Sequence, residues 1–247
     1  MIHEDLYRAL DPVEFSRHIG IEPDPWQADV LRYEGRRLLL NCSRQSGKST
    51  TAAIQGLHMA VYRPNSLILL VSPSLRQSSE LFRKVKAGYD ALEFQLDLTE
   101  NNKLSAQFSN GSRVVSLPAD HATVRGFSGV AMVIEDEAAQ VRDEFYYAIL
   151  PMLIVNNGVF IGMSTPYGKR GHFFKEWVDG GDDWKRVEVP AAQCPRIGTE
   201  ELERQRRSLG SMFFRQEFNC EFVETVDQVF GYDMIQEAFD DAVEPLF

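Results

Sequence analysis

The chain has 247 residues, 44% of them hydrophobic, and a formal net charge of −10. This length and composition allow a large buried core, as one domain or as one domain with a small appendage. No apolar run approaches the ~20 residues of a membrane span and no signal-peptide pattern opens the chain, so we expect neither a membrane protein nor a secreted one. The three cysteines lie far apart without metal-ligand spacing, which predicts a reducing, cytoplasmic setting without disulfides.

The negative charge is concentrated at the C-terminus. Residues 221–247 contain eight Asp and Glu residues and no Lys or Arg, which leaves a net charge of only −2 for residues 1–220. A polyanion would therefore bind the body of the protein rather than its tail. The basic clusters at residues 83–86, 169–170 and 204–207 are candidate contacts to a phosphate backbone, or solvated helix faces.

Apolar runs and turn residues predict alternating helices and strands along the chain. The predicted elements are, in order, helices 13–19 and 26–33, strand 37–42, helix 49–62, strand 66–71, helix 75–91, strands 104–108, 113–117, 132–135, 159–163 and 184–189, and helices 199–208 and 211–218. Asn110-Gly111 predicts a hairpin between two of the strands. This alternation predicts an α/β fold with a mostly parallel sheet and helices on both faces.

The turn after strand 37–42 has the composition of a phosphate-binding loop. Its residues are Ser43, Arg44, Gln45, Ser46, Gly47, Lys48, Ser49 and Thr50. Backbone N–H groups of such a loop point at the phosphates of ATP, Lys48 would reach the β- and γ-phosphates, and the Ser49 hydroxyl would ligate Mg²⁺. The match is partial, because Cys42 stands where the full pattern has its first glycine.

A second acidic element supports a nucleotide site. The buried strand around 130–134 ends in Glu135, Asp136 and Glu137. Carboxylates at the end of such a strand suit Mg²⁺–phosphate chemistry: Asp136 would hold the metal and Glu137 would activate the attacking water. Three consecutive acids leave the register open, so Glu135 is a candidate for a structural role. A solvated acidic turn is the alternative for this stretch taken alone.

Smaller motifs add candidates with open alternatives. Trp26 and Gln27 would cover and read adenine, or Trp26 is simply a core residue. Arg44 would reach the γ-phosphate or brace the loop against a carboxylate. Arg125, on a glycine-flanked loop, would stabilise transition-state charge in its own site or a neighbour's, or lie in a surface turn. Ser164-Thr165, at a strand end, would couple hydrolysis to a loop shift, or form only a turn.

Together these residues resemble the N-terminal ATPase of the large terminase subunit of tailed bacteriophages. The resemblance spans roughly residues 26–247 and includes the loop without its first glycine. It is carried by residues 25–27, 43–49, 73–77, 125–126, 134–139, 164–166, 218–222 and 245–247.

The resemblance implies a RecA-like P-loop NTPase of the ASCE class that forms a homo-oligomeric ring on the viral portal. Such a motor drives double-stranded DNA into a procapsid in the host cytoplasm, together with a small terminase subunit. It implies an ATPase core at residues 1–197 and a C-terminal helical lid or linker at 198–247. We expect a monomer in isolation, and no nuclease activity, because no such domain follows. The alternatives are a helicase-like ATPase and a non-hydrolysing DNA-binding module.

Overall fold

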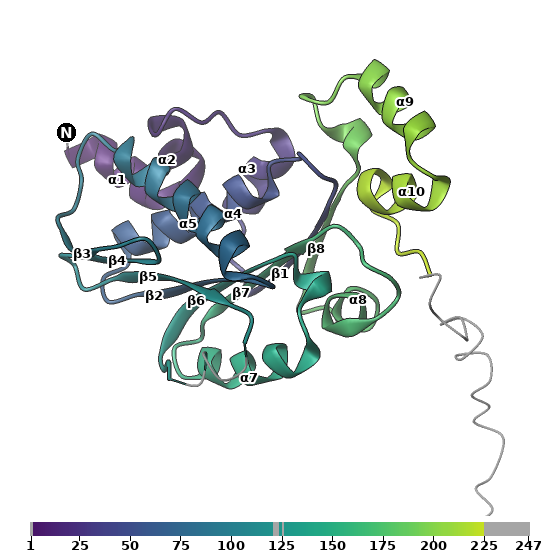
Figure 1. Ribbon diagram of the computed structural model, residues 1–247. Helices are drawn as coiled ribbons and strands as arrows, with labels where there is room; N and C mark the ends of the chain where they lie inside the picture. The colour runs from purple at the N-terminus through teal and green to yellow at the C-terminus, as the bar shows by residue number, and fades with distance from the viewer. Residues whose placement is uncertain (1, 121–123, 125, 225–247) are drawn as a thin grey trace, which may run out of the picture.

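The structure, a computed structural model, describes residues 2–120, 124 and 126–224. Within these residues its centre is an eight-stranded sheet in the order β3-β4-β5-β2-β6-β7-β1-β8 (Figure 1). The strands are β1 Arg37–Cys42, β2 Leu67–Ser72, β3 Leu98–Asn101, β4 Ser105–Phe108, β5 Arg113–Pro118, β6 Val130–Asp136, β7 Val159–Ser164 and β8 Lys185–Val189. The pairs from β5 to β8 are parallel, and β3 and β4 form an antiparallel edge.

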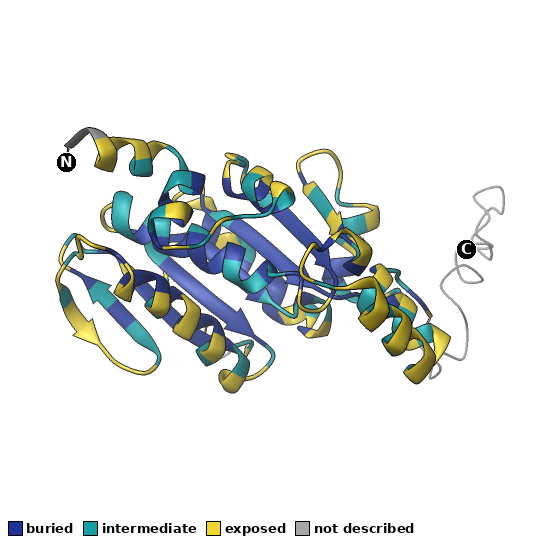
Figure 2. Cartoon of the chain, turned by 90° about the horizontal axis from the view of Figure 1, so that it is seen from above, coloured by how far each residue is buried: buried dark blue, intermediate teal, exposed yellow. Residues whose placement is uncertain are grey.

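The strands are apolar along their length because helices cover both faces of the sheet. Alternate residues of β1 show this, since Leu38 and Leu40 belong to one apolar cluster and Leu39 to the other. Figure 2 shows the strands buried and the outer helix faces exposed. The helices are α1 Ile2–Leu10, α2 Pro12–His18, α3 Pro25–Leu31, α4 Lys48–Tyr62, α5 Leu75–Asp90, α7 Asp143–Ile154, α8 Gly171–Val178, α9 Thr199–Ser208 and α10 Ser211–Asn219, with 3₁₀ turns η1 Ala138–Gln140 and η2 Ala191–Gln193.

The two faces carry different helices. Helices α1 to α5 lie on one face, and α7 and α8 lie on the other (Figure 1). The first apolar cluster joins the sheet to α4 and α5, and the second joins it to α7 and α8. Parallel strands end at the same edge of a sheet, so the segments that follow β1, β6 and β7 meet there. The predicted α/β sheet with helices on both faces is therefore confirmed.

Some elements differ from the sequence prediction. Helix α7 was missed because Pro151 lies in its last turn, where proline normally signals a break. Helices α1 and α8 and the edge strand β3 were also missed. Helix α8 was missed because glycines are typical of turns: Gly168 precedes the helix, Gly171 is its first residue, and both have positive φ angles. The predicted hairpin through Asn110-Gly111 joins β4 to β5 as expected.

The C-terminal helices α9 and α10 lie beyond β8 (Figure 1). They contact the core near the end of β1, where the Asn41 side chain donates a hydrogen bond to the Cys220 carbonyl at 2.8 Å. Phe222 packs with Phe174 of α8, with ring centroids 5.1 Å apart. The division of the chain at residue 197 stays a prediction. Within the described residues, no helix combines the length and apolarity needed to cross a membrane.

Candidate nucleotide site

The loop between β1 and α4 has the backbone geometry of an anion-binding turn. Gly47 caps α4 with a φ of 96°, and Gln45 has a φ of 61°. This positive φ at Gly47 favours glycine, and a Cβ atom there would also lie 2.6 Å from Gln27 Nε2 and 3.0 Å from a nitrogen of Arg196. The loop opens directly into the 15-residue helix α4, whose N-terminal N–H groups favour an anion.

Several polar groups of this loop are buried with few partners. Lys48 is 7% exposed, and its Nζ lies 3.5 Å from the Cys42 carbonyl oxygen. Ser43 and Ser46 are fully buried, and Ser46 Oγ has no hydrogen-bond partner in the described residues. Buried charges and hydroxyls are unfavourable without partners, so this set suits a phosphate entering the loop. Cys42 lies in the apolar core, fully buried, and this burial raises the pKa of its thiol.

The end of β6 meets the start of α4. Ser49, in the first turn of α4 beside Thr50, has its Oγ 3.5 Å from Asp136 Oδ2. Burial raises the pKa of Asp136 to about 6, with the negative charge of Glu137 contributing to the rise and Lys48 opposing it. The phosphate loop and the acidic strand end therefore converge on one place.

Glu137 has a backbone conformation that is rare for its residue type. Its φ of 54° and ψ of 42° are left-handed, and they turn the chain from β6 into η1. Such strain concentrates at functional sites, because the surrounding structure has to hold it. Glu137 Oε2 accepts a hydrogen bond of 3.4 Å from the Ser164 hydroxyl at the end of β7. Ser164 and the next residue, Thr165, are both buried.

The oxygen donors suit a magnesium ion that is completed by phosphates. In the part of the chain that the structure describes, no three His, Cys, Asp or Glu side chains gather as a metal site. Mg²⁺ in nucleotide sites usually takes only one or two protein oxygens, with water and phosphate as the other ligands. The hydroxyl of Ser49 and the carboxylate of Asp136, 3.5 Å apart, fit that pattern.

Arg44 contacts the C-terminal segment. Its Nε lies 2.5 Å from Glu217 Oε2 on α10, and its backbone N–H donates to the Glu217 carbonyl at 3.1 Å. Of the two roles left open by the sequence, the contact to a carboxylate is the one present. A role for Arg44 at the γ-phosphate stays a prediction. The other candidate finger, Arg125, lies outside the described residues.

Gln27 and Trp26 lie next to the phosphate loop. Gln27 Oε1 accepts a hydrogen bond of 2.8 Å from the Asp24 N–H, which fixes the amide with its Nε2 toward Gly47. Trp26 packs against the core, and its buried Nε1 has no partner among the described residues. Adenine recognition by these two residues stays a prediction.

Arg196 was missed by sequence reasoning. Its guanidinium donates to the Ser46 carbonyl at 2.6 Å and pairs with Asp24 at 2.8 Å. It therefore joins the loop after β8 to the phosphate loop and to the cap of α3. No local signal marks this residue, because its partner Ser46 lies 150 positions away.

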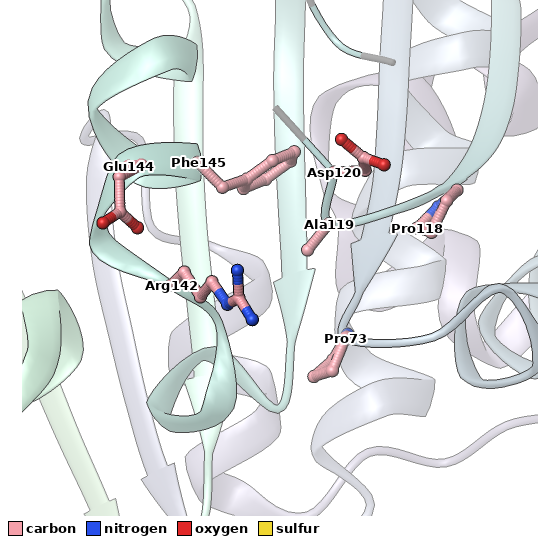
Figure 3. A pocket seen from close by; sticks show the side chains of 7 residues that line it. All are labelled: Pro73, Pro118, Ala119, Asp120, Arg142, Glu144 and Phe145. Atoms are coloured by element: carbon pink, nitrogen blue, oxygen red, sulfur yellow. The ribbon is translucent and has the colours of Figure 1, made fainter. Parts of the chain in front are cut away.

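A cavity of about 660 Å³ lies at the ends of β2 and β5 beside α7 (Figure 3). The Arg142 side chain points into it from the residue before α7, and Asp120 lies on the opposite wall. No residue of the phosphate loop lines this cavity. The nucleotide site is therefore identified by its anion-binding groups and not by the size of a hollow.

The basic clusters are partly occupied by neighbours on their own helices. Arg83 pairs with Glu80 on α5 at 2.6 Å, and Arg204 pairs with Glu201 on α9 at 3.2 Å. Pairs three residues apart on an exposed helix contribute little to stability and leave the cations accessible. A DNA-contacting role for these clusters stays a prediction.

Solved structures share this fold. The large terminase ATPase domain of Thermus phage P74-26 is similar with a TM-score of 0.73 at 22% identity, covering 85% of this chain and 98% of that chain. The large terminase of another thermophilic bacteriophage, in complex with ATP-gamma-S, is similar with a TM-score of 0.62 at 12% identity, covering 87% of this chain and 52% of that chain. This chain therefore shares the α/β fold of these large terminase structures.

The chain belongs to the family described as terminase large subunit, T4likevirus-type, N-terminal, which matches residues 39–237. It is 27% identical over 226 residues to the terminase large subunit of Escherichia phage T5, a match that covers 85% of this chain and 50% of that protein. The chain spans about half the length of the curated relatives it matches. The resemblance inferred from the sequence motifs is confirmed.

Proposed function

We propose that this chain is the ATPase motor domain of a terminase large subunit, which hydrolyses ATP with Mg²⁺ to move double-stranded DNA into a procapsid. One observation carries the proposal: the Ser49 hydroxyl lies 3.5 Å from the Asp136 carboxylate. A phosphate loop and an acidic strand end that share one site are the two halves of a phosphoryl-transfer centre. Family membership and the ATP-gamma-S complex of the thermophilic phage terminase support the same reaction.

The proposed mechanism assigns roles to residues of the phosphate loop and of the acidic end of β6. The loop N–H groups and Lys48 bind the triphosphate. Ser49 and Asp136 would hold Mg²⁺, which when bound would supply positive charge that offsets the charge of the phosphates. Glu137 takes the proton of the attacking water. An arginine, Arg44 or Arg125, offsets charge on the γ-phosphate.

Ser164 supplies the coupling between hydrolysis and movement. Its hydroxyl donates to Glu137, so a change at the catalytic carboxylate alters a hydrogen bond to the end of β7. Thr165 follows directly and leads into the segment that begins α8. Loss of the γ-phosphate therefore shifts this segment, and the shift moves a DNA-gripping surface.

The proposed partners follow from the family. The domain acts as a homo-oligomeric ring on the portal, with the small terminase subunit and double-stranded DNA, in the cytoplasm of the infected host. In dilute solution without those partners we expect a monomer with weak basal ATPase activity. Helicase-like unwinding would instead indicate the alternative function.

The test is ATP binding and hydrolysis by two variants. Lys48→Ala removes the buried cation of the phosphate loop, so ATP binding is expected to be lost. Glu137→Gln keeps the size of the side chain and removes the base, so ATP still binds while kcat falls about 10²–10⁴-fold. Lys185→Ala, at an exposed position on β8, is the matched control. Unchanged ATP affinity in Lys48→Ala would contradict the site, and unchanged kcat in Glu137→Gln would contradict the mechanism.

A further inference from the structure

A buried carboxylate lies directly behind the catalytic end of β6. Successive residues of a strand point to opposite faces, so Val133 and Glu135 face α7 and α8, while Ile134 and Asp136 face α4. Glu135 is 0% exposed. The residues around it on this face of the sheet are apolar. The next two residues along the chain, Asp136 and Glu137, carry the proposed chemistry.

His172 is the polar partner of this carboxylate. Its Nε2 lies 2.8 Å from Glu135 Oε2, and the two side chains are 1% and 0% exposed. The other carboxylate oxygen, Glu135 Oε1, has no hydrogen-bond partner among the described residues. A buried carboxylate is strongly unfavourable without a paired donor, so His172 fixes where the side chain of Glu135 lies.

His172 is itself held by the elements around it. Its backbone N–H donates to Asp143 Oδ1 at 2.7 Å, and this carboxylate at the start of α7 also lies 3.6 Å from His172 Nδ1. The Tyr146 ring stacks on the imidazole with centroids 4.4 Å apart and planes at 11°. The imidazole therefore cannot rotate away, and it ties the end of β6 to the first turns of both α7 and α8.

The same short segment connects His172 to the coupling residues. Ser164 ends β7, Thr165 follows it, and α8 begins at Gly171, one residue before His172. At one end of this segment the Ser164 hydroxyl contacts Glu137. At its other end His172 contacts Glu135, so both ends are bound to the same three-residue stretch at the end of β6.

We propose that His172 is a positioning residue for ATP hydrolysis, which holds Asp136 and Glu137 in register through its contact with Glu135. The inference rests on the proposed function and adds a residue to it. Displacements of about 1 Å at a catalytic group can lower a rate about 100-fold even when the substrate still binds. His172 therefore affects the chemical step more than the affinity for ATP, because the loop N–H groups and Lys48, which bind the triphosphate in the proposed mechanism, follow β1 and make no contact with Glu135 or His172 among the described residues.

The first experiment measures kcat and ATP affinity separately. His172→Gln leaves Glu135 buried beside a neutral amide, and we expect kcat to fall about 10- to 100-fold with ATP affinity changed less than about twofold. Glu135→Gln/His172→Gln removes the buried charge and keeps an amide contact, so kcat is expected to return to within about threefold of the unsubstituted chain.

His58→Gln is the matched control. His58 is half-buried between Phe15 and Tyr62, and its Nε2 lies 2.9 Å from the Arg8 carbonyl oxygen, away from the site. We expect this change to lower the melting temperature without changing kcat. A His172→Gln protein that behaves in the same way, or a double variant as slow as the single one, would overturn the proposal. Absence of ATPase activity in the unsubstituted chain would instead contradict the proposed function.

A second pair of variants applies if His172→Gln does not fold. Glu135→Gln/His172→Gln and Glu135→Gln/His172→Phe both lack the buried charge, and only the first keeps a hydrogen bond between β6 and α8. We expect kcat to be at least about tenfold lower in the phenylalanine variant at equal ATP affinity. Equal kcat values in the two proteins would show that His172 only fills space.

Discussion

At the scale of single residues, the site contains groups that suit chemistry better than they suit stability. Asp136 is charged in a place where burial and Glu137 both oppose the charge. Glu137 is held in a left-handed backbone conformation that costs about 1–3 kcal/mol for a residue other than glycine. Proteins keep such unfavourable arrangements where a ligand or a reaction needs them. The two residues therefore carry a stability cost that a simple substitution should reveal.

The substitution is Asp136→Asn, which we expect to stabilise the fold while it impairs Mg²⁺-dependent activity. The folded-state pKa of Asp136 is raised from 3.8 to about 6. At pH 7 the ionised form therefore opposes folding by roughly 2 kcal/mol after allowance for partial exposure, which corresponds to a rise in Tm of about 4–8 °C in the variant.

The pH dependence provides the check. An acid with a raised folded-state pKa lowers stability above its unfolded pKa, and the penalty disappears when both states are protonated. The gain of Asp136→Asn should therefore shrink as the pH falls below about 6 and vanish below about 4. Thermal unfolding from about pH 3.5 to about pH 7.5 covers this window. A variant that is less stable than the unsubstituted chain at neutral pH would contradict the assigned cost.

At the scale of elements, the phosphate loop is held from both sides by the C-terminal part of the chain. On one side Arg196 donates to the Ser46 carbonyl, and on the other Glu217 of α10 pairs with Arg44. A carbonyl that is bound on the outside of the loop leaves the adjoining N–H groups directed inward, toward an anion. The segment after β8 therefore contributes to the shape of the proposed nucleotide site, although it carries none of the predicted loop residues.

Arg196→Ala should weaken ATP binding about fivefold, because a half-exposed charged contact contributes on the order of 1 kcal/mol. The fall in affinity should come with little change in Tm. Titration with a fluorescent ATP analogue measures the effect. Arg206→Ala, whose side chain pairs only with Glu203 on α9 among the described residues, is the control and should bind ATP normally. Equal ATP affinities in the two variants would show that Arg196 does not contribute to ATP binding and would contradict this prediction.

At the scale of the whole molecule, the phosphate loop and the carboxylates meet at one edge of the sheet. The strand order puts β7 between β6 and β1, so residues that follow three neighbouring strands meet at the proposed nucleotide site. In the proposed mechanism, the arginine that completes this site would come either from the chain itself, as Arg44, or from a neighbouring subunit, as Arg125. Arg44 already pairs with Glu217, so in the proposed ring a neighbouring subunit is the simpler source of the arginine.

Mixing two inactive variants distinguishes these sources. Arg125→Ala keeps Glu137, and Glu137→Gln keeps Arg125, so neighbouring subunits in a mixed ring can restore one complete site. We expect each variant alone to be at least about 100-fold slower than the unsubstituted chain, and the mixture to exceed either by about tenfold. ATPase assays at concentrations where the chain self-associates measure this. No gain on mixing, together with an inactive Arg44→Ala, would assign the arginine to the same chain.

The sequence alone determined the parts of this protein that are local in the chain. Lys48 and Ser49 follow one apolar strand, and Asp136 and Glu137 lie at the end of another. The phosphate loop and the acidic strand end can therefore each be recognised from a few consecutive residues. The α/β class could also be predicted from the sequence, because the apolar runs of buried strands and the helices between them are local patterns. Helix α7 was not predicted because Pro151, in its last turn, is a residue that usually indicates the end of a helix.

Only the tertiary structure decided which distant side chains support the site. Arg196 meets Ser46 across 150 positions, Glu217 meets Arg44 across 173, and His172 meets Glu135 across 37. None of these contacts is marked by a motif, since an ion pair or a hydrogen bond needs proximity in space and no particular spacing in sequence. Local patterns determine elements because their hydrogen bonds and apolar faces are local, whereas contacts between elements depend on how the sheet orders its strands.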